Sequence, residues 1–221
     1  MIAPDRLAAL QALQDDALAA AAAVGTGFYL TGGAAAARGY LRHRLADALE
    51  LEASDDPRFG LWCVQVVNAL AGSSSWKAEV LRRQPRFVRL TVARGEWTLP
   101  VELSNHAFPH VGELTVHPVL GRLSSVENLV ADLVTALADR VEPEDLADLW
   151  GFCCRERFPP GRALEFAREK AAAVFPIDLA RVVSAPTRAD WELVRWTNPP
   201  PAEGYLQDLR HLAEELLLLK V

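Results

Sequence analysis

The sequence has few cysteines, and their arrangement excludes two common roles. The three cysteines are Cys63, Cys153 and Cys154, an odd count with one adjacent pair, which does not fit a disulfide framework. No Cys-x-x-Cys spacing is present, so the chain lacks the usual ligand pattern of a structural zinc site. Reduced thiols are typical of a cytoplasmic protein, and we expect that localisation.

Long apolar runs are also missing. The stretch over residues 17–24 is apolar, but it is far shorter than the roughly 20 residues that a membrane-spanning helix requires. The chain does not open with a basic segment followed by an apolar one, which is the pattern of a secretory signal. We therefore expect no membrane partner and interpret residues 17–24 as the end of a buried helix.

Positive charge is scarce as well. The formal net charge is −6 and the sequence pI is about 5.4, which argues against a broad surface for nucleic acid, because such binding depends on neutralising phosphates. Basic residues nevertheless cluster in two places: Arg38, Arg42, His43 and Arg44, and Arg82, Arg83, Arg86 and Arg89. Either cluster could be a local contact patch or an ordinary solvated surface.

The pattern of apolar residues changes along the chain. Several segments before residue 120 favour strands, and Phe87 to Val92 alternates in part, whereas everything after Ser125 follows a helical period. The sequence predicts an α+β fold with a mixed sheet of four to five strands drawn from residues 25–120. We expect a core domain over residues 1–123 and a helical region over residues 124–221.

The most informative segment runs from Phe28 to Glu52. It predicts a short apolar strand ending at Thr31, a Gly32-Gly33 turn, a helix over residues 34–44 and a second strand over residues 48–53. A strand, a glycine turn and a helix N-terminus form an arrangement that binds phosphate, because the first N–H groups of the helix are unpaired. A strand with carboxylates beside it could bring a metal ion to that phosphate.

Several short motifs in this order resemble one known family. They are Leu30-Thr31-Gly32-Gly33-Ala34, His43-Arg44, Ala48-Leu49-Glu50-Leu51, Pro100-Val101-Glu102-Leu103, and Arg140 with Asp145 and Asp148. Together they are similar to the AbiEii/AbiGii-type nucleotidyltransferase-like proteins of the polymerase-beta-like nucleotidyltransferase superfamily. The resemblance covers about residues 25–152.

The resemblance implies a site for Mg²⁺ and a nucleoside triphosphate. Glu50 and Glu102 stand where the family has metal-binding carboxylates, and Glu52 could complete the set, because residues i and i+2 of a strand point to the same face. These three glutamates are the candidate catalytic residues and metal ligands. The candidate nucleotide-binding residues are Gly32, Gly33, Arg44 and Arg140.

Three departures from the family pattern concern the chemistry itself. Ala34 replaces a hydroxyl, Ala48 replaces the first carboxylate and Leu133 replaces a lysine. The sequence therefore favours a nucleotidyltransferase-fold protein that is catalytically degenerate and acts in binding or regulation. The alternative is an active Mg²⁺-dependent nucleotidyltransferase, a toxin of a toxin–antitoxin or phage-defence system that acts on RNA. Whether the chain is an enzyme stays open.

Other features leave further alternatives. Arg140, Asp145 and Asp148 could form a structural network or contact a nucleotide. His106, His110 and His117 could bind a metal, although they lie in an irregular segment without helical geometry. The partners that these readings imply are a nucleotide or RNA, a cognate antitoxin-like protein, and a second copy of the chain docked through the apolar helix over residues 202–220.

Overall fold

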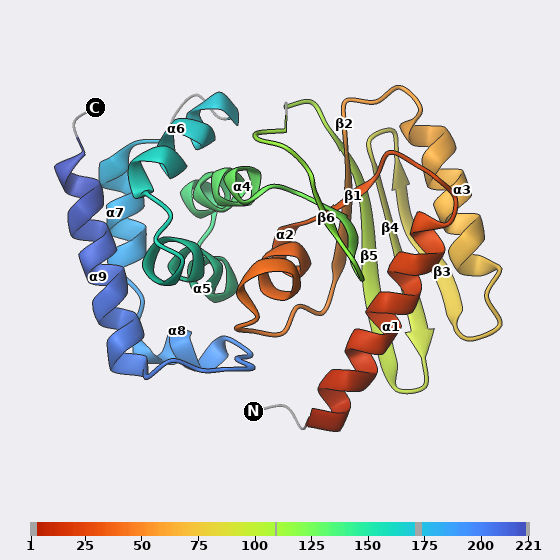
Figure 1. Ribbon diagram of the computed structural model, residues 1–221, viewed down its shortest axis with the longest axis horizontal. Coiled ribbons are helices and arrows are strands. Elements are labelled where there is room, and N and C mark those ends of the chain that lie inside the picture. Colours follow the sequence, from red (N-terminus) through yellow and green to blue (C-terminus); the bar gives the residue numbers. More distant parts are fainter. Residues whose placement is uncertain (1–3, 109, 171–173, 220–221) are drawn as a thin grey trace. The chain divides into compact units, whose positions relative to one another are not determined.

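The computed structural model describes residues 4–108, 110–170 and 174–219, and these residues form two compact units (Figure 1). The sheet unit contains residues 4–35 and Ala46–Ser124, and the helical unit contains Ala36–Leu45 and residues 125–219. The division therefore assigns Ala36–Leu45 to the helical unit, whereas the sequence-based division placed this segment in the first domain. No helix within the described ranges has the length and apolar character needed to cross a membrane.

The sheet unit is built on a mixed sheet, which in its described residues has seven strands in the order β3-β4-β5-β2-β1-β7-β6. The β2–β5 and β1–β7 pairs are parallel and the other neighbours are antiparallel. The strands are β1 (Tyr29–Thr31), β2 (Leu49–Ser54), β3 (Lys77–Gln84), β4 (Phe87–Arg94), β5 (Trp97–His106), β6 (Thr115–His117) and β7 (Gly121–Leu123).

One face of this sheet is apolar and forms the core of the unit. Leu30, Leu51, Leu103 and Val88 stand opposite one another on successive strands, and each is at most 6% exposed. The helices α1 (Pro4–Ala22) and α3 (Phe59–Ala71) pack beside each other against the sheet (Figure 1). Side chains alternate along a strand, so the residues just before and after each of these four lie on the opposite face of the sheet.

The prediction of four to five strands was wrong, because β3, β6 and β7 were missed. Strand β3 is an edge strand whose residues are nearly all exposed, so it has no apolar alternation. Strands β6 and β7 are only three residues long. Strand β5, which contains Pro100, lies between β4 and β2. Pro100 pairs with β4 just before the β2 pairing begins at Val101.

The helical unit confirms the predicted change of period. Ser125 caps α4 by accepting a hydrogen bond from the Asn128 backbone N–H at 3.0 Å. After Ser124 the described residues form helices and no strand beyond the isolated bridge of Trp196 to Arg44. The helices are α4 (Val126–Asp139), α5 (Pro143–Trp150), η2 (Gly151–Arg155), α6 (Pro160–Lys170), α7 (Pro176–Ser184), α8 (Arg188–Leu193) and α9 (Ala202–Leu218).

The helix expected over residues 34–44 has a different form. A short α2 (Gly32–Ala34) continues as a π-helix, η1 (Ala35–Leu41), and the left-handed φ of 52° at Arg42 ends it. In the helical unit Leu41 packs against Gly151 of the second π-helix, η2, where a Cβ atom would come within 2.5 Å of Leu41 Cδ1. The predicted helix is present, but the sequence did not predict that most of it has the wider turn of a π-helix.

Candidate functional site

The polar face of the sheet carries a row of functional side chains. Thr31 of β1 pairs with Glu50 of β2, Glu50 pairs with Glu102 of β5, and Glu102 pairs with Arg89 of β4. Paired residues on neighbouring strands point to the same face, so these four side chains form one line across four strands. The sheet therefore brings Glu50 and Glu102 together at the places that the sequence motifs predicted.

Gly32 directly follows this row and contacts the carboxylate of Glu50. Its φ is +60°, and a Cβ atom at this position would lie 2.4 Å from Glu50 Oε1 and 2.6 Å from Oε2. Glycine is needed here both for the left-handed backbone and for the space that the carboxylate occupies. Gly33 lies in the same short helix and is partly buried. Gly32 thus leaves the space in which the Glu50 carboxylate lies.

Replacing Gly32 with alanine is expected to lower the free energy of unfolding by about 1–2 kcal/mol. The left-handed backbone costs roughly that much for a residue with a Cβ atom, and the Glu50 carboxylate must also move. Chemical denaturation measures the effect. The matched control is Gly60→Ala in α3, where a Cβ atom meets nothing within 4 Å and a small stabilisation is expected. Equal effects of the two changes would contradict the role given to Gly32.

Thr31 was not among the candidate residues, yet it lies in the same row. It is 5% exposed, and its hydroxyl oxygen has no hydrogen-bond partner among the residues that the structure describes. A buried hydroxyl without a partner is unusual and calls for an explanation, such as a bound water or ligand group. In the sequence, Thr31 ends an apolar strand just before the two glycines. The family's hydroxyl was expected just after them, at Ala34.

Glu52 lies on the same face as Glu50 but has a structural contact where metal binding was expected. It is 5% exposed, and the Tyr29 hydroxyl donates a hydrogen bond to its Oε1 atom at 2.7 Å. The same hydroxyl lies 3.0 Å from Ser54 Oγ. A buried carboxylate that accepts such a bond is held inside the fold, because moving it to a metal would leave polar groups unpaired.

Glu102 is held from its other side by Arg89. The guanidinium donates from Nε to Glu102 Oε1 at 2.8 Å and also from a terminal nitrogen to the same oxygen. The Arg89 side chain is 51% exposed, so this ion pair contributes little to stability. The ion pair nevertheless neutralises the negative charge of the Glu102 carboxylate, which would otherwise attract a metal ion.

The described residues contain no group of three or more His, Cys, Asp or Glu side chains placed to hold a metal ion. This finding includes the candidate set Glu50, Glu52 and Glu102. It also covers the histidines. His110 instead contacts the Gly112 carbonyl and the Ser124 hydroxyl, each at 3.1 Å, while His117 Nδ1 accepts bonds from two backbone N–H groups of the following turn. Within the described residues the three glutamates are therefore not gathered around one point, and their binding of Mg²⁺ stays a prediction.

Arg44, a predicted nucleotide-binding residue, lies in a buried ion cluster of the helical unit. Its Nε and Nη2 atoms donate to the two carboxylate oxygens of Asp148 at 2.7 and 2.6 Å, and both side chains are at most 3% exposed. A third nitrogen donates to Glu144 at 3.2 Å. Burial alone would lower the pKa of Arg44, but the charge of Asp148 and its hydrogen bond raise it above the ordinary value. Arg44 therefore serves the fold of this unit.

His43 and the Arg195–Thr197 segment complete the cluster. His43 is fully buried with Nε2 at 3.1 Å from Asp148 Oδ1, although neither ring nitrogen has the alignment of a hydrogen bond. Leu45 N–H donates to the Arg195 carbonyl at 2.8 Å, and Thr197 N–H donates to the His43 carbonyl at 2.9 Å. The His-Arg pair of the sequence motif thus anchors Ala36–Leu45 to α5 and to the segment before α9.

Arg140 and Asp145 form a looser pair in the same unit. Arg140 Nη2 is 3.6 Å from Asp145 Oδ2, and the Arg140 side chain is 65% exposed. Partial burial raises the pKa of Asp145, and the nearby Arg140 opposes this rise. The interpretation of Arg140, Asp145 and Asp148 as a structural network is consistent with these contacts, while the role of the exposed Arg140 in nucleotide binding stays a prediction.

Leu133 stands where the family has a lysine, and the structure brings a different lysine, Lys170, to the adjacent residue Asp132. Leu133 is buried in α4, but the adjacent Asp132 accepts a bond from Lys170 Nζ of α6 at 2.5 Å. Asn128, one turn earlier, donates to the other Asp132 oxygen at 2.9 Å. Lys170 is 38 residues away from Asp132 in the chain, so no local spacing could have predicted this buried cation.

The cysteines show no sign of reactivity. Burial raises the pKa of Cys63 to about 11 and of Cys154 to about 12, and it raises that of Cys153 further. A thiol with a raised pKa is protonated at neutral pH and is a poor nucleophile.

Comparison with known proteins identifies the fold. No family model and no curated protein matches the sequence. Among solved structures, JHP933 from Helicobacter pylori is 18% identical with a TM-score of 0.66, covering 98% of this chain and 93% of that one. A candidate nucleotidyltransferase from H. pylori is 19% identical with a TM-score of 0.62, covering 93% and 94%.

The third similar structure is MenT4, a nucleotidyltransferase toxin from Mycobacterium tuberculosis. It is 17% identical with a TM-score of 0.68, covering 97% of this chain and 85% of that one. The chain therefore has the nucleotidyltransferase-like fold that the short motifs predicted. Identities this low establish the fold alone.

Proposed function

We propose that this chain is a nucleotidyltransferase-fold protein whose transfer site is catalytically degenerate and which acts in binding or regulation. The observation that carries the proposal is the state of Glu52. The first carboxylate position is Ala48, so an i, i+2 pair on β2 would require Glu52. The buried contact with Tyr29 commits Glu52 to the fold instead.

The remaining carboxylates support the same proposal. Glu50 lies against Gly32, and Glu102 is neutralised by Arg89. Phosphoryl transfer in this fold relies on metal ions that neutralise the triphosphate, and Mg²⁺ requires several hard oxygen ligands in near-octahedral geometry. Glu50 and Glu102 alone provide fewer protein ligands than the family arrangement. The resemblance to AbiEii/AbiGii-type proteins thus concerns the fold rather than the reaction.

The alternative is an active Mg²⁺-dependent nucleotidyltransferase that acts on RNA as a toxin, with an antitoxin-like partner. Two observations favour keeping it. MenT4, which has a similar fold, is a nucleotidyltransferase toxin. The unpartnered Thr31 hydroxyl also offers a polar group beside Glu50. Under this alternative Glu50 and Glu102 would bind Mg²⁺, and Gly32 and Gly33 would approach the phosphates.

Thermal unfolding with each ribonucleoside triphosphate and Mg²⁺ separates the two functions. A ligand at about 100 times its dissociation constant stabilises by about 2.7 kcal/mol, which is a shift of roughly 5–10 °C for a chain of this size. We expect the wild type to shift by less than about 1 °C at millimolar nucleotide and to transfer no label to RNA or protein. A full shift that Glu50→Gln abolishes would overturn the degenerate-site proposal.

The variant Ala48→Asp tests the same proposal by restoration. It places a carboxylate two residues before Glu50, where the sequence motif of the family has one, so it is expected to gain a Mg²⁺-dependent nucleotide shift that the wild type lacks. The matched control is Ala48→Asn, which has the same size without the charge. A shift in both variants, or an equal shift in the wild type, would show that position 48 is not what limits binding.

A further inference from the structure

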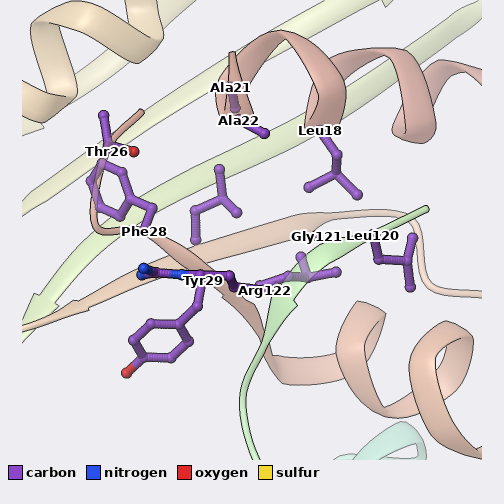
Figure 2. A pocket seen from close by; sticks show the side chains of 11 residues that line it. Leu18, Ala21, Ala22, Thr26, Phe28, Tyr29, Leu120, Gly121 and Arg122 are labelled. Carbon is purple, nitrogen blue, oxygen red and sulfur yellow. The ribbon is translucent and has the colours of Figure 1, made fainter. Parts of the chain in front are cut away.

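The sheet unit contains a cavity on the apolar face of the sheet, opposite the row of Glu50. The cavity measures about 200 Å³ and lies between the C-terminal half of α1 and strands β1, β2 and β7 (Figure 2). Leu18, Leu30 and Leu51 are among its buried walls. Figure 2 shows the Tyr29 side chain pointing away from the cavity, toward the face that carries Glu52.

Small residues explain why the space exists. Ala21 and Ala22 on the last turn of α1 and Gly121 at the start of β7 leave room that larger side chains would fill. A Cβ atom at Gly121 would meet nothing within 4 Å. Protein interiors usually close such gaps, so an apolar cavity of this volume can accept an apolar guest.

The rim of the cavity carries one charge. Arg122 is one of the residues that line the cavity (Figure 2). Its guanidinium donates a hydrogen bond to the Gly27 carbonyl. Arg122 is exposed and forms no ion pair within the described ranges. A guanidinium has five N–H donors, so the bond to Gly27 leaves others for a ligand at the rim.

We propose that this cavity binds a small amphipathic anion, an unbranched acyl chain of about six to eight carbons with a carboxylate that pairs with Arg122. The size follows from the volume, since a water molecule occupies about 30 Å³ and a methylene group is of similar size. The sign of the head group follows from Arg122, because charge-assisted bonds between a guanidinium and a carboxylate are strong and directional.

The proposal does not depend on the nucleotidyltransferase chemistry. The cavity residues Leu30 and Leu51 and the row residues Thr31 and Glu50 are sequence neighbours that point to opposite faces of β1 and β2. A ligand in the cavity would thus contact the strand that leads directly into Gly32. Occupancy could be measured in variants in which Glu50 is changed, without touching the cavity.

Calorimetric titration of the full chain with octanoate, 1-octanol and octylammonium tests the proposal. Octanoate is expected to bind most tightly and octylammonium at least tenfold more weakly. Arg122→Gln is expected to weaken octanoate about tenfold and 1-octanol less than twofold. The matched control is Arg82→Gln, which removes the same charge from the exposed strand β3 and should leave all three affinities unchanged.

A second variant tests the cavity itself. Ala21→Leu fills the space from α1 and is expected to weaken octanoate and 1-octanol alike by more than tenfold, while circular dichroism shows that the chain still folds. If Ala21→Leu fails to fold, the Arg122→Gln result still decides the question. Absence of octanoate binding, or equal affinities for octanoate and octylammonium, would overturn the proposal.

Discussion

Replacing Asp148 with asparagine is expected to lower the free energy of unfolding by about 3–5 kcal/mol, which corresponds to a fall in Tm of roughly 6–20 °C. The change keeps the shape of the side chain but leaves the buried Arg44 guanidinium without its two-point charge partner. A buried charge that loses its main counter-ion costs far more than a lost surface ion pair, because little water reaches it and Glu144 contacts Arg44 through only one nitrogen.

The matched control is Glu144→Gln, which removes a second partner of Arg44. Its side chain is 34% exposed and contacts Arg44 at 3.2 Å, so the expected loss is below about 1 kcal/mol. Chemical denaturation, followed by tryptophan fluorescence from Trp150 and Trp196 in the same unit, measures both changes. A loss below 1 kcal/mol for Asp148→Asn would contradict the structural role of Arg44 and return it to the candidate nucleotide-binding residues.

The double variant Arg44→Met with Asp148→Leu gives an independent test. Replacing both members of a buried ion pair with apolar residues of similar volume is often close to neutral. We therefore expect the double variant to be more stable than Asp148→Asn alone. If the double variant loses as much as the single variant, packing rather than the unpaired charge would explain the effect.

The second large effect is expected for Tyr29→Phe, which removes the donor to the buried Glu52 carboxylate. A hydrogen bond to a charged group contributes roughly 1.5–3 kcal/mol, so we expect a destabilisation of about 2 kcal/mol. Glu52→Gln is expected to show a smaller loss, because the amide oxygen can still accept the bond. Chemical denaturation of both single variants and of the double variant gives the coupling energy between the two residues.

This cycle also decides between the two roles of Glu52. A structural Glu52 gives the same coupling energy with and without Mg²⁺. The matched control is Ser54→Ala, which removes a second contact of the Tyr29 hydroxyl from an exposed residue. If Mg²⁺ stabilises the wild type and this stabilisation disappears in Glu52→Gln, Glu52 is a metal ligand after all and the alternative function gains support.

Short-range features of the fold were predictable from sequence because they depend on neighbouring residues. The helical period predicted after Ser125 agrees with the structure, in which Ser125 caps α4, since apolar periodicity and capping act within a few residues. The alignment of Glu50 with Glu102 followed from motif order. Strand β3 escaped prediction, because an exposed edge strand has no apolar face to reveal it.

The sequence by itself determined the change from strands to helices and the position of Glu50 beside Gly32. Only the tertiary structure decided which charged residues belong to the fold. Arg44 and Asp148 are 104 residues apart, and Lys170 meets Asp132 across two helices. The role of a carboxylate depends on its burial and its partner. Glu52 is an example, because the hydrogen bond from the Tyr29 hydroxyl holds it inside the fold. Such contacts form only when distant segments pack together.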